Sequence, residues 1–390
     1  MNNFLSKIEN FICYFCFSII ITFPIFQILS RSIDFFSIPA SQEIVQHMTL
    51  WIAFMGAVLA ARSNRLLAVV REPVFKPSPE FNIGYFLVHA VSVSVVFLLA
   101  VSYLKMIQIG IQYPDFIAPF ITVWFAQSII PVGLFLIWYH MIMTSSDKLN
   151  YRLFLVFCSF LAILVFYYWQ SPYSNEILLT IQVLCTLALV AFGLPIFVVL
   201  AALSIIFFLS EPNEWTTNFN LISTISDSAY SIVVRPTLAA IPIFTLAGYL
   251  LAESNISRRL LDFFKTSFGW LPGSTVLIVV LLCAFFTALT GGSGITILAL
   301  GAVLYPVLVE DGYSKMFSLG LVTAAGSLGL LFPPSLPAII YSVTAGINPI
   351  DLFKQGFLPA LFLLLVVVLY GFYHRPVSYT HLTLPTNREV

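Results

Sequence analysis

The sequence predicts an all-α polytopic membrane protein. Sixty per cent of its 390 residues are apolar and only 9% are charged, whereas a soluble domain carries about 25% charged residues. A helix needs about 20 apolar residues to cross a hydrocarbon core about 30 Å thick, and runs of that kind recur from Phe11 almost to Tyr373. Lys and Arg together number 17, as do Asp and Glu, so the net charge gives no reason to expect a nucleic-acid partner.

The apolar runs predict about nine spans, a re-entrant helical hairpin and a broken helix. The first run follows Lys7 and is longer than the apolar core of a signal peptide, so we expect it to be a retained span. The sixth run contains Gly193-Leu194-Pro195, which predicts a turn inside it. The runs cover residues 11–30, 44–61, 83–104, 121–143, 153–169, 177–209, 236–252, 274–309, 316–346 and 355–373.

The positions of the basic residues predict how the spans are oriented. Most Lys and Arg residues fall in loops on one side of the predicted spans, and the loop expected at residues 210–228, on the other side, holds none. By the positive-inside rule the basic side is cytoplasmic, and the N-terminus lies there. The basic residues expected on the opposite side are Arg31, Lys105, Arg235 and Lys354.

A glycine-rich tip predicts the re-entrant hairpin. As one straight helix, residues 274–309 would be about 54 Å long at about 1.5 Å per residue, which exceeds one crossing. Gly291, Gly292, Ser293 and Gly294 stand near the middle, and glycine breaks helices and permits close approach of backbone. Backbone without helical hydrogen bonds at membrane depth must be buried in protein or face a watery cavity. We therefore expect a hairpin that turns at these four residues.

A pair of prolines predicts the broken helix in the uncharged segment 317–350, because Pro333 and Pro334 each remove a backbone donor. A discontinuous helix exposes carbonyl oxygens, which suit Na⁺, and N–H groups, which suit an anionic substrate. We expect tip and break to form one substrate and ion site, although glycines that only permit tight helix packing are the alternative. The candidate residues are Gly291, Gly292, Ser293, Gly294, Thr296, Gly326, Ser327, Gly329, Pro333, Pro334 and Ser335, with Gly292, Ser293, Gly326 and Ser335 as candidates for Na⁺.

Other polar residues in the apolar runs are interpreted as packing residues. His89 and His140 lie in apolar segments and His47 lies near the start of one, and a membrane histidine without an acidic partner is a poor proton relay. The sequence contains no H-E-x-x-H pair, no phosphate-binding glycine loop and no nucleophile–base cluster. We therefore expect a transporter and not an enzyme, with no cofactor other than a coupling ion.

The two unusual regions resemble the large (M) subunit of the tripartite ATP-independent periplasmic (TRAP) transporters. The matching stretches occur in one order along the chain, although the family's tip usually has a Ser-Gly-Ser-Ser-like sequence and this tip reads Gly-Gly-Ser-Gly. The stretches are residues 242–248, 285–294, 326–329, 332–335 and 352–359.

The N-terminal part resembles, more faintly, the small (Q) subunit of the same family, although Arg65 stands where a histidine is common. The residues that fit its second helix are Trp51, Phe54, Gly56, Ala57 and Arg62. The resemblance divides the chain into a small-subunit-like four-helix membrane domain (1–145), a linking helix (146–175), the first half of a large-subunit-like domain (176–375) and a tail (376–390). The tail is polar and looks like a translated sequencing adapter, so we expect it to be non-native.

The resemblance implies an elevator-type secondary transporter in the bacterial inner membrane, driven by a Na⁺ gradient. It implies a periplasmic substrate-binding protein as partner and carboxylate-bearing small solutes as substrates. The family has a second, inverted hairpin and broken helix that this sequence lacks, so we expect a fused but truncated permease that does not transport alone. The alternatives are a Na⁺-coupled dicarboxylate symporter that needs no binding protein, and a non-transporting membrane scaffold or fragment.

Overall fold

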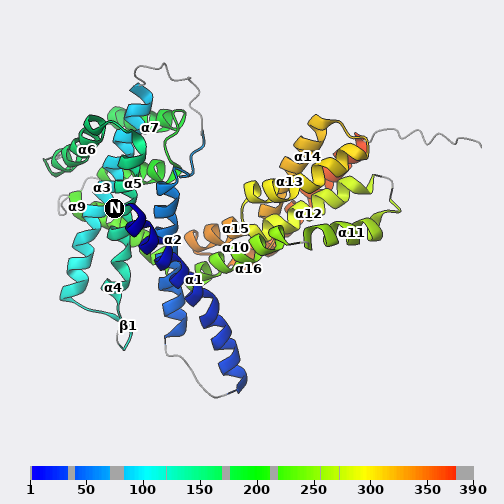
Figure 1. Cartoon of the computed structure of the whole chain (residues 1–390), viewed down its shortest axis with the longest axis horizontal. Helices are drawn as coiled ribbons and strands as arrows, with labels where there is room; N and C mark the ends of the chain where they lie inside the picture. The colour runs from blue at the N-terminus through cyan, green and yellow to red at the C-terminus, as the bar shows by residue number, and fades with distance from the viewer. Residues whose placement is uncertain are drawn as a thin grey trace, which may run out of the picture. The chain divides into compact units, whose positions relative to one another are not determined.

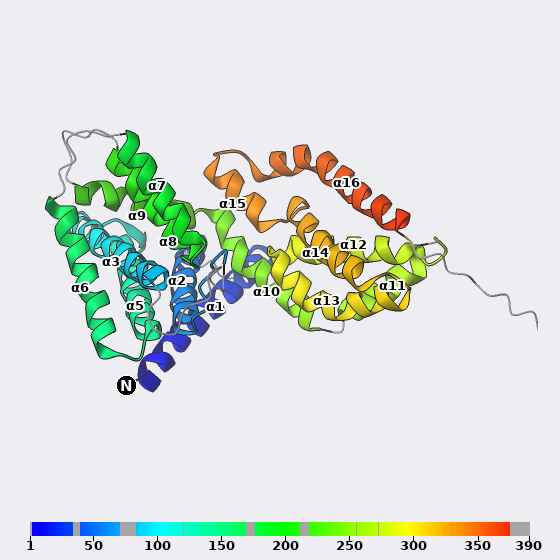
Figure 2. The ribbon, with the colours of Figure 1, turned by 90° about the horizontal axis from the view of Figure 1, so that it is seen from above.

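The computed structural model describes residues 2–33, 40–70, 83–119, 121–168, 176–210, 218–254, 256–271 and 273–374. The chain divides into two compact units, Met1–Ala239 and Ala240–Val390, drawn as ribbons in Figures 1 and 2. The subunit-like division expected at residues 145 and 175 stays a prediction, and the tail at 376–390 lies outside the described residues.

The first unit consists of helices and one short strand pair. Its helices are α1 (Asn2–Ile33), α2 (Ser41–Arg62), α3 (Ile83–Gln112), α4 (Val123–Gln127), α5 (Ile129–Ser145), α6 (Leu149–Tyr168), α7 (Glu176–Val190), α8 (Ile196–Ser210) and α9 (Asn218–Val233), followed by the 3-10 segment η1 (Pro236–Ala239). Strands β1 (Phe116–Ala118) and β2 (Ile121–Thr122) pair antiparallel.

The second unit is helical throughout its described residues. It contains α10 (Ala240–Glu253), α11 (Ile256–Phe268), α12 (Ser274–Thr290), α13 (Ser293–Glu310), α14 (Lys315–Leu328), the 3-10 segment η2 (Gly329–Leu331), α15 (Leu336–Thr344) and α16 (Pro349–Tyr373).

The helices confirm an all-α polytopic membrane protein. Within the described ranges, 5 helices are long and apolar enough to cross a membrane, or up to 7 if each bent helix pair counts as one span. The five are Phe4–Ser30, Ser41–Arg62, Gly84–Gln112, Val123–Ser145 and Pro349–Tyr373. The runs at 236–252 and 316–346 belong to the two bent pairs, and the other remaining runs form shorter apolar helices of 10–17 residues, two of which are interrupted by turns such as the one between α7 and α8.

The core of the first unit is built around α3, which packs against α5, α6 and α9 (Figure 2). Val93 and Tyr103 of α3 and Leu50 of α2 are fully buried in this core. A Cβ on Gly133 of α5 would lie 2.9 Å from Cβ of Phe54, so the glycine lets α5 and α2 approach closely. Burial of these apolar side chains holds the helices of the unit together.

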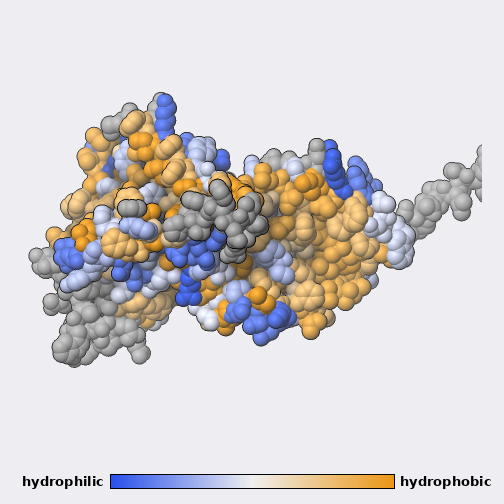
Figure 3. All heavy atoms as spheres, turned by 90° about the horizontal axis from the view of Figure 1, so that it is seen from below, coloured by the Kyte–Doolittle hydropathy of each residue, from blue (hydrophilic) through white to orange (hydrophobic). Residues whose placement is uncertain are grey.

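The core of the second unit is built around α12, which packs against α10, α11, α13, α14 and α16. Apolar residues such as Val279, Leu282 and Phe286 bury it on almost every side, as expected for a central helix. The unit's outer surface is also apolar: Leu298, Leu358 and Phe362 are exposed, and hydrophobic atoms cover much of the visible face in Figure 3. Such a surface is suited to lipid.

Three elements differ from the sequence-based expectation. The predicted loop at 210–228 is wrong from Asn218 onwards, because Ile222 is fully buried and anchors α9 in the core. The fourth span begins at Val123, whose N–H donates to the Asp115 carbonyl at 2.8 Å after the unexpected strand pair. Helix α11 lies where only a basic loop was expected, and Leu261 on its apolar side packs into the core.

Candidate functional site

The predicted hairpin is present and turns at its glycines. Helix α12 ends at Thr290, Gly291 takes a left-handed conformation (φ 69°), Gly292 is extended (φ −142°, ψ 116°) and α13 begins at Ser293. The left-handed conformation favours glycine, which has no Cβ to clash with the backbone. The 17 residues of α12 span about 26 Å, slightly less than a hydrocarbon core. Re-entry of the hairpin into the membrane stays a prediction.

Polar groups at the turn bond to one another. Thr290 Oγ1 lies 3.0 Å from Thr296 Oγ1, and the two hydroxyls lie 3.4 and 3.5 Å from the Gly292 carbonyl oxygen. That carbonyl also accepts a hydrogen bond from the Thr296 N–H at 3.3 Å. Both threonines are buried, so the turn satisfies these groups inside the protein and not in lipid, where they would remain unpaired.

Glycines let neighbouring helices approach the tip. A Cβ on Gly248 of α10 would lie 2.8 Å from Cα of Thr290, and a Cβ on Gly291 would lie 2.3 Å from a methyl carbon of Leu336 at the start of α15. Both distances are far below ordinary carbon–carbon contact of about 3.5–4.0 Å. A Cβ on Gly326 of α14 would likewise meet a side chain of α13 at 2.8 Å. The tip is therefore enclosed by α10, α14 and α15.

The predicted broken helix is confirmed at the prolines. Helix α14 gives way to η2 at Gly329, the chain is extended at Phe332 (φ −94°, ψ 145°), and α15 begins at Leu336. The two helical pieces, Lys315–Leu331 and Leu336–Thr344, are bent by 41°. Pro333 and Pro334 lie between them, where neither can donate a backbone hydrogen bond.

Two buried hydroxyls lie where α12 packs against the break. Thr287 and Ser335 are both 0% exposed. Neither the Thr287 Oγ1 atom nor the Ser335 Oγ atom has a hydrogen-bond partner among the described residues. A Cβ on Gly329 would lie 2.5 Å from Cβ of Thr287, so Thr287 faces η2. Ser335 directly precedes Leu336, which meets the tip at Gly291. A buried hydroxyl without a partner costs about 1–3 kcal/mol, and such a group calls for an ion, ligand or water to bind it.

The predicted site residues do not all come together. The Ser293 carbonyl oxygen would lie 3.6 Å from a Cβ on Gly326, so these two residues and Gly292 are neighbours. Ser327 is exposed, and its hydroxyl donates to the Thr323 carbonyl of its own helix at 3.3 Å. Gly294 is helical and exposed, with nothing within 4 Å of a Cβ there, so it is not part of the tight turn. Pro333 is exposed as well.

Sequence reasoning missed Thr287 and Thr290. They are three residues apart on α12, so they share one side of the helix, and this spacing next to a predicted tip was a usable signal. Their apolar neighbours Phe286 and Ala288 are also buried, because α12 is enclosed on almost every side. The sequence alone does not say which of the two hydroxyls finds a partner.

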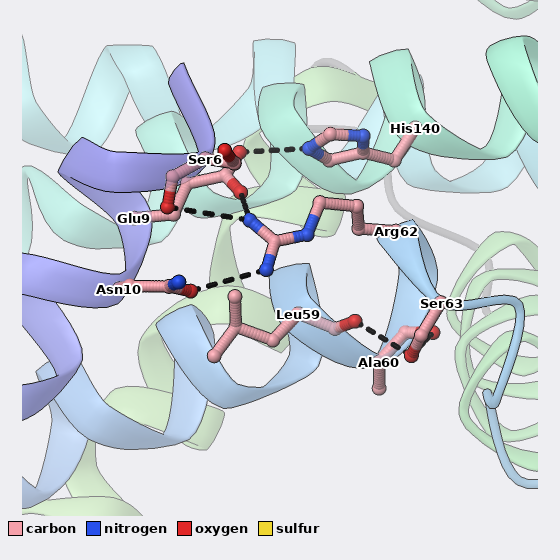
Figure 4. A network of polar contacts seen from close by, with 8 residues as sticks. All are labelled: Ser6, Glu9, Asn10, Leu59, Ala60, Arg62, Ser63 and His140. Atoms are coloured by element: carbon pink, nitrogen blue, oxygen red, sulfur yellow. Dashed lines mark hydrogen bonds and ion pairs between the residues drawn. The ribbon is translucent and has the colours of Figure 1, made fainter. Parts of the chain in front are cut away.

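A second polar cluster lies in the first unit, where α1, α2 and α5 meet (Figure 4). The Glu9 carboxylate accepts a hydrogen bond from Arg62 Nη1 at 2.6 Å and lies 2.7 Å from His140 Nε2. Arg62 Nη2 also donates to Asn10 Oδ1 at 3.1 Å. The interpretation of His140 as a histidine without an acidic partner is wrong, because its partner is Glu9. The sequence does not reveal this pair, since the two residues are 131 positions apart and only the fold brings them close.

The other two histidines that the sequence singled out have partners as well. His47 Nδ1 lies 2.7 Å from the Glu43 carbonyl oxygen, and His47 Nε2 lies 2.9 Å from the Tyr230 hydroxyl. The contact with Tyr230 ties α2 to α9. His89 Nδ1 lies 2.9 Å from the Tyr85 carbonyl oxygen of its own helix.

A buried polar site between a glycine-turned hairpin and a broken helix, in a polytopic protein, is typical of a membrane transport protein. Residues 183–381, half of the chain, match the family model of the tripartite ATP-independent periplasmic transporter, DctM component. The chain belongs to this family, as the resemblance predicted: it is a TRAP transporter permease of the inner membrane with many spans.

Several curated proteins are similar to this chain. The C4-dicarboxylate TRAP transporter large permease protein DctM of Vibrio cholerae is 32% identical over 180 residues, which are 46% of this chain and 39% of that protein. The isethionate TRAP transporter permease protein DctMQ of Oleidesulfovibrio alaskensis is 35% identical over 153 residues, 39% of this chain and 24% of that protein. The ectoine TRAP transporter large permease protein TeaC of Halomonas elongata is 30% identical over 192 residues, 49% and 44% respectively. The chain spans less than half the length of each.

Proposed function

We propose that the chain forms part of a secondary active importer in which the meeting point of hairpin tip and helix break binds Na⁺ and a small organic anion. The observation that carries the proposal is the pair of buried hydroxyls on Thr287 and Ser335, which have no hydrogen-bond partner within the part of the chain that the structure describes. They lie on the two elements, α12 and the break before α15, that the sequence singled out independently. An unpaired hydroxyl in an apolar core destabilises the fold, so we expect a bound group to interact with each of them.

Na⁺ fits the chemistry of these groups. It is a hard cation that takes oxygen ligands, and unwound backbone next to helix ends supplies them in membrane transporters. The oxygen atoms that would hold it are Thr287 Oγ1, Ser335 Oγ and the Ser293 carbonyl oxygen next to Gly326. All three residues are uncharged, so a bound monovalent cation would bring the only formal charge to this group of ligands.

An anionic group fits the two helix starts next to these oxygens. Helices α13 and α15 begin at Ser293 and Leu336, and neither has a side chain that caps its first turn. Their N–H groups carry the positive end of the helix dipole, which attracts a carboxylate or a similar acid. Bound Na⁺ beside them would strengthen that attraction, which couples ion and substrate.

The relatives support an acidic solute without selecting one. Their names give C4-dicarboxylates, isethionate and ectoine, and each of these molecules carries an acid group. As in the family, a periplasmic binding protein would deliver the solute, and the N-terminus would lie in the cytoplasm. Membership of this family disfavours a symporter that works without a binding protein.

Thermal unfolding of the purified chain in detergent tests the ion site directly. NaCl should raise the midpoint temperature in a saturable way, because an ion that binds only the folded state stabilises it. Choline chloride at the same ionic strength is the control for screening and should have no such effect. Equal curves in the two salts would remove the support for Na⁺ and favour a purely packing role for tip and break.

A further inference from the structure

The first unit contains a cavity whose lining shares no residue with the hairpin site. Its volume is about 340 Å³, at the lower end of the range of about 300–1,000 Å³ for small-molecule sites. The end of α2, the start of α3, the end of α5 and the turn between α7 and α8 line it. All of these elements belong to one compact unit.

The segment after α2 forms one wall of the cavity and is held in place by backbone pairing. Ala68 pairs with Pro195 as an isolated β-bridge, and the Ile196 N–H donates to the Leu67 carbonyl at 2.9 Å. Gly193 has φ +94°, and a Cβ there would lie 3.2 Å from the Val70 carbonyl oxygen, so only glycine suits this turn. The wall is thus built by specific contacts between segments far apart in sequence.

The cavity lining includes a buried hydroxyl that has no partner among the described residues. Ser92 of α3 is 1% exposed, lines the cavity, and its Oγ has no hydrogen-bond partner among the described residues. Ser102 on the same helix shows the ordinary solution, because its Oγ donates to the Leu99 carbonyl at 2.9 Å. Leaving Ser92 unpaired is costly, so a group that enters the cavity has a hydrogen-bonding site to occupy.

His89, one turn before Ser92, adds a second polar group to the lining. Its Nδ1 lies 2.9 Å from the Tyr85 carbonyl oxygen, and since a carbonyl only accepts, Nδ1 carries the hydrogen and donates. In the neutral ring Nε2 is then an acceptor. Ser92 and His89 together therefore suit a hydroxyl group, which both donates and accepts.

The rest of the lining sets the class of ligand. Asn64, Tyr85 and Thr144 are exposed residues of the lining, whereas Val88 and Met141 are buried. Most of the remaining lining is apolar, and none of the described lining residues carries a formal charge. A charged ligand would be desolvated here without a counter-charge, which is strongly unfavourable.

We propose that this cavity is a binding site for an uncharged amphipathic molecule whose hydroxyl group bonds to Ser92 and His89 and whose alkyl part packs against the apolar walls. Such a molecule comes either from the bilayer, as a monoacylglycerol-like lipid, or from solution, as a small alkyl alcohol. The site is independent of the proposed ion site, because the two share no residue.

Thermal unfolding in the presence of two probes tests the site. The protein is purified in lauryldimethylamine oxide, a detergent without hydroxyl groups, and titrated with monoolein and with 1,2-hexanediol. We expect a saturable rise of the midpoint temperature with at least one probe. A rise with monoolein alone indicates a lipid ligand. A rise with hexanediol, alone or together with a rise with monoolein, indicates that a short alkyl alcohol suffices.

Two variants and one control decide whether the effect arises in this cavity. Ser92→Ala should weaken the apparent affinity for the probe about fivefold, as expected for the loss of one hydrogen bond, and Val88→Phe should abolish binding by filling the space. Ser102→Ala, a buried serine of the same helix with its own partner, should leave the affinity unchanged. If Val88→Phe does not fold, Ser92→Ala alone decides. Absence of saturation with both probes, or equal affinity of the wild type and Ser92→Ala, would overturn the proposal.

Discussion

His140 Nε2 lies 2.7 Å from Glu9 Oε1, and the Glu9 side chain is 1% exposed. The same carboxylate accepts a hydrogen bond from Arg62 at 2.6 Å, so one buried acid joins α1, α2 and α5. Only 11% of the apolar window of α1 is buried inside the protein, and α1 packs mainly against α2. The polar cluster adds an attachment of α1 that also reaches α5.

Removing Arg62 should loosen that attachment. Arg62→Ala leaves a buried carboxylate without its cationic partner, which costs about 3–5 kcal/mol in buried pairs, and we expect the lower end because Arg62 is partly exposed. The free energy of unfolding in mixed detergent micelles measures the loss. Arg65→Ala removes an exposed arginine just after the same helix and should have little effect. Similar losses in the two variants would show that the cluster does not anchor α1.

The two outer glycines of the tip should respond differently to alanine. Gly291→Ala places a Cβ on a left-handed residue, which costs about 1–2 kcal/mol, and drives it into Leu336 at 2.3 Å. Gly294→Ala meets nothing within 4 Å, and alanine favours a helix over glycine. Unfolding free energies should therefore fall for the first variant and stay level or rise for the second. A loss in Gly294→Ala as large as that in Gly291→Ala would contradict the turn described here.

Close packing at the break predicts a second contrast. A Cβ on Gly329 would lie 2.5 Å from the Ala284 carbonyl oxygen, whereas Gly320 of α14 has nothing within 4 Å. Gly329→Ala should push η2 away from Thr287. This displacement should lower the midpoint temperature of unfolding and weaken the response to Na⁺. Gly320→Ala should keep both properties. An unchanged Na⁺ response in a destabilised Gly329→Ala protein would separate packing at the break from ion binding.

Membrane orientation is testable with single cysteines. The five free cysteines are first replaced, and cysteine is then introduced at Lys148, between α5 and α6, or at Tyr113, after α3. With the N-terminus in the cytoplasm, an impermeant thiol reagent added to whole cells should label position 113 but not position 148. The reverse pattern would invert the proposed orientation.

The local breaks of the second unit could be predicted from sequence. The turn at Gly291 and Gly292 and the break at Pro333 and Pro334 depend on backbone chemistry that each residue carries with it. The turn between α7 and α8 is predicted for the same reason. At α11 the basic residues predict only a loop, whereas the helix also has an apolar side that packs into the core through Leu261.

The contacts between distant residues could not be predicted. Glu9 and His140 are 131 residues apart, and they meet only because α1 and α5 both pack against α2. Thr287 is a candidate site residue because η2 approaches it at Gly329. Ser327 was predicted for the site, but its hydroxyl donates to a carbonyl of its own helix. Such choices depend on how helices pack, which one sequence does not reveal.

Binding of Na⁺ by the Thr287 hydroxyl can be measured as the Na⁺ dependence of the unfolding midpoint in one pair of variants. Thr287→Val keeps the shape of the side chain and removes the oxygen. Thr323→Val makes the same change at an exposed threonine of α14, whose hydroxyl already bonds to Leu319 at 2.8 Å. We expect Thr287→Val to need about tenfold more Na⁺ for half of the stabilisation, which corresponds to about 1.4 kcal/mol, and Thr323→Val to match the wild type. The same Na⁺ dependence in all three proteins would show that the Thr287 hydroxyl does not bind Na⁺.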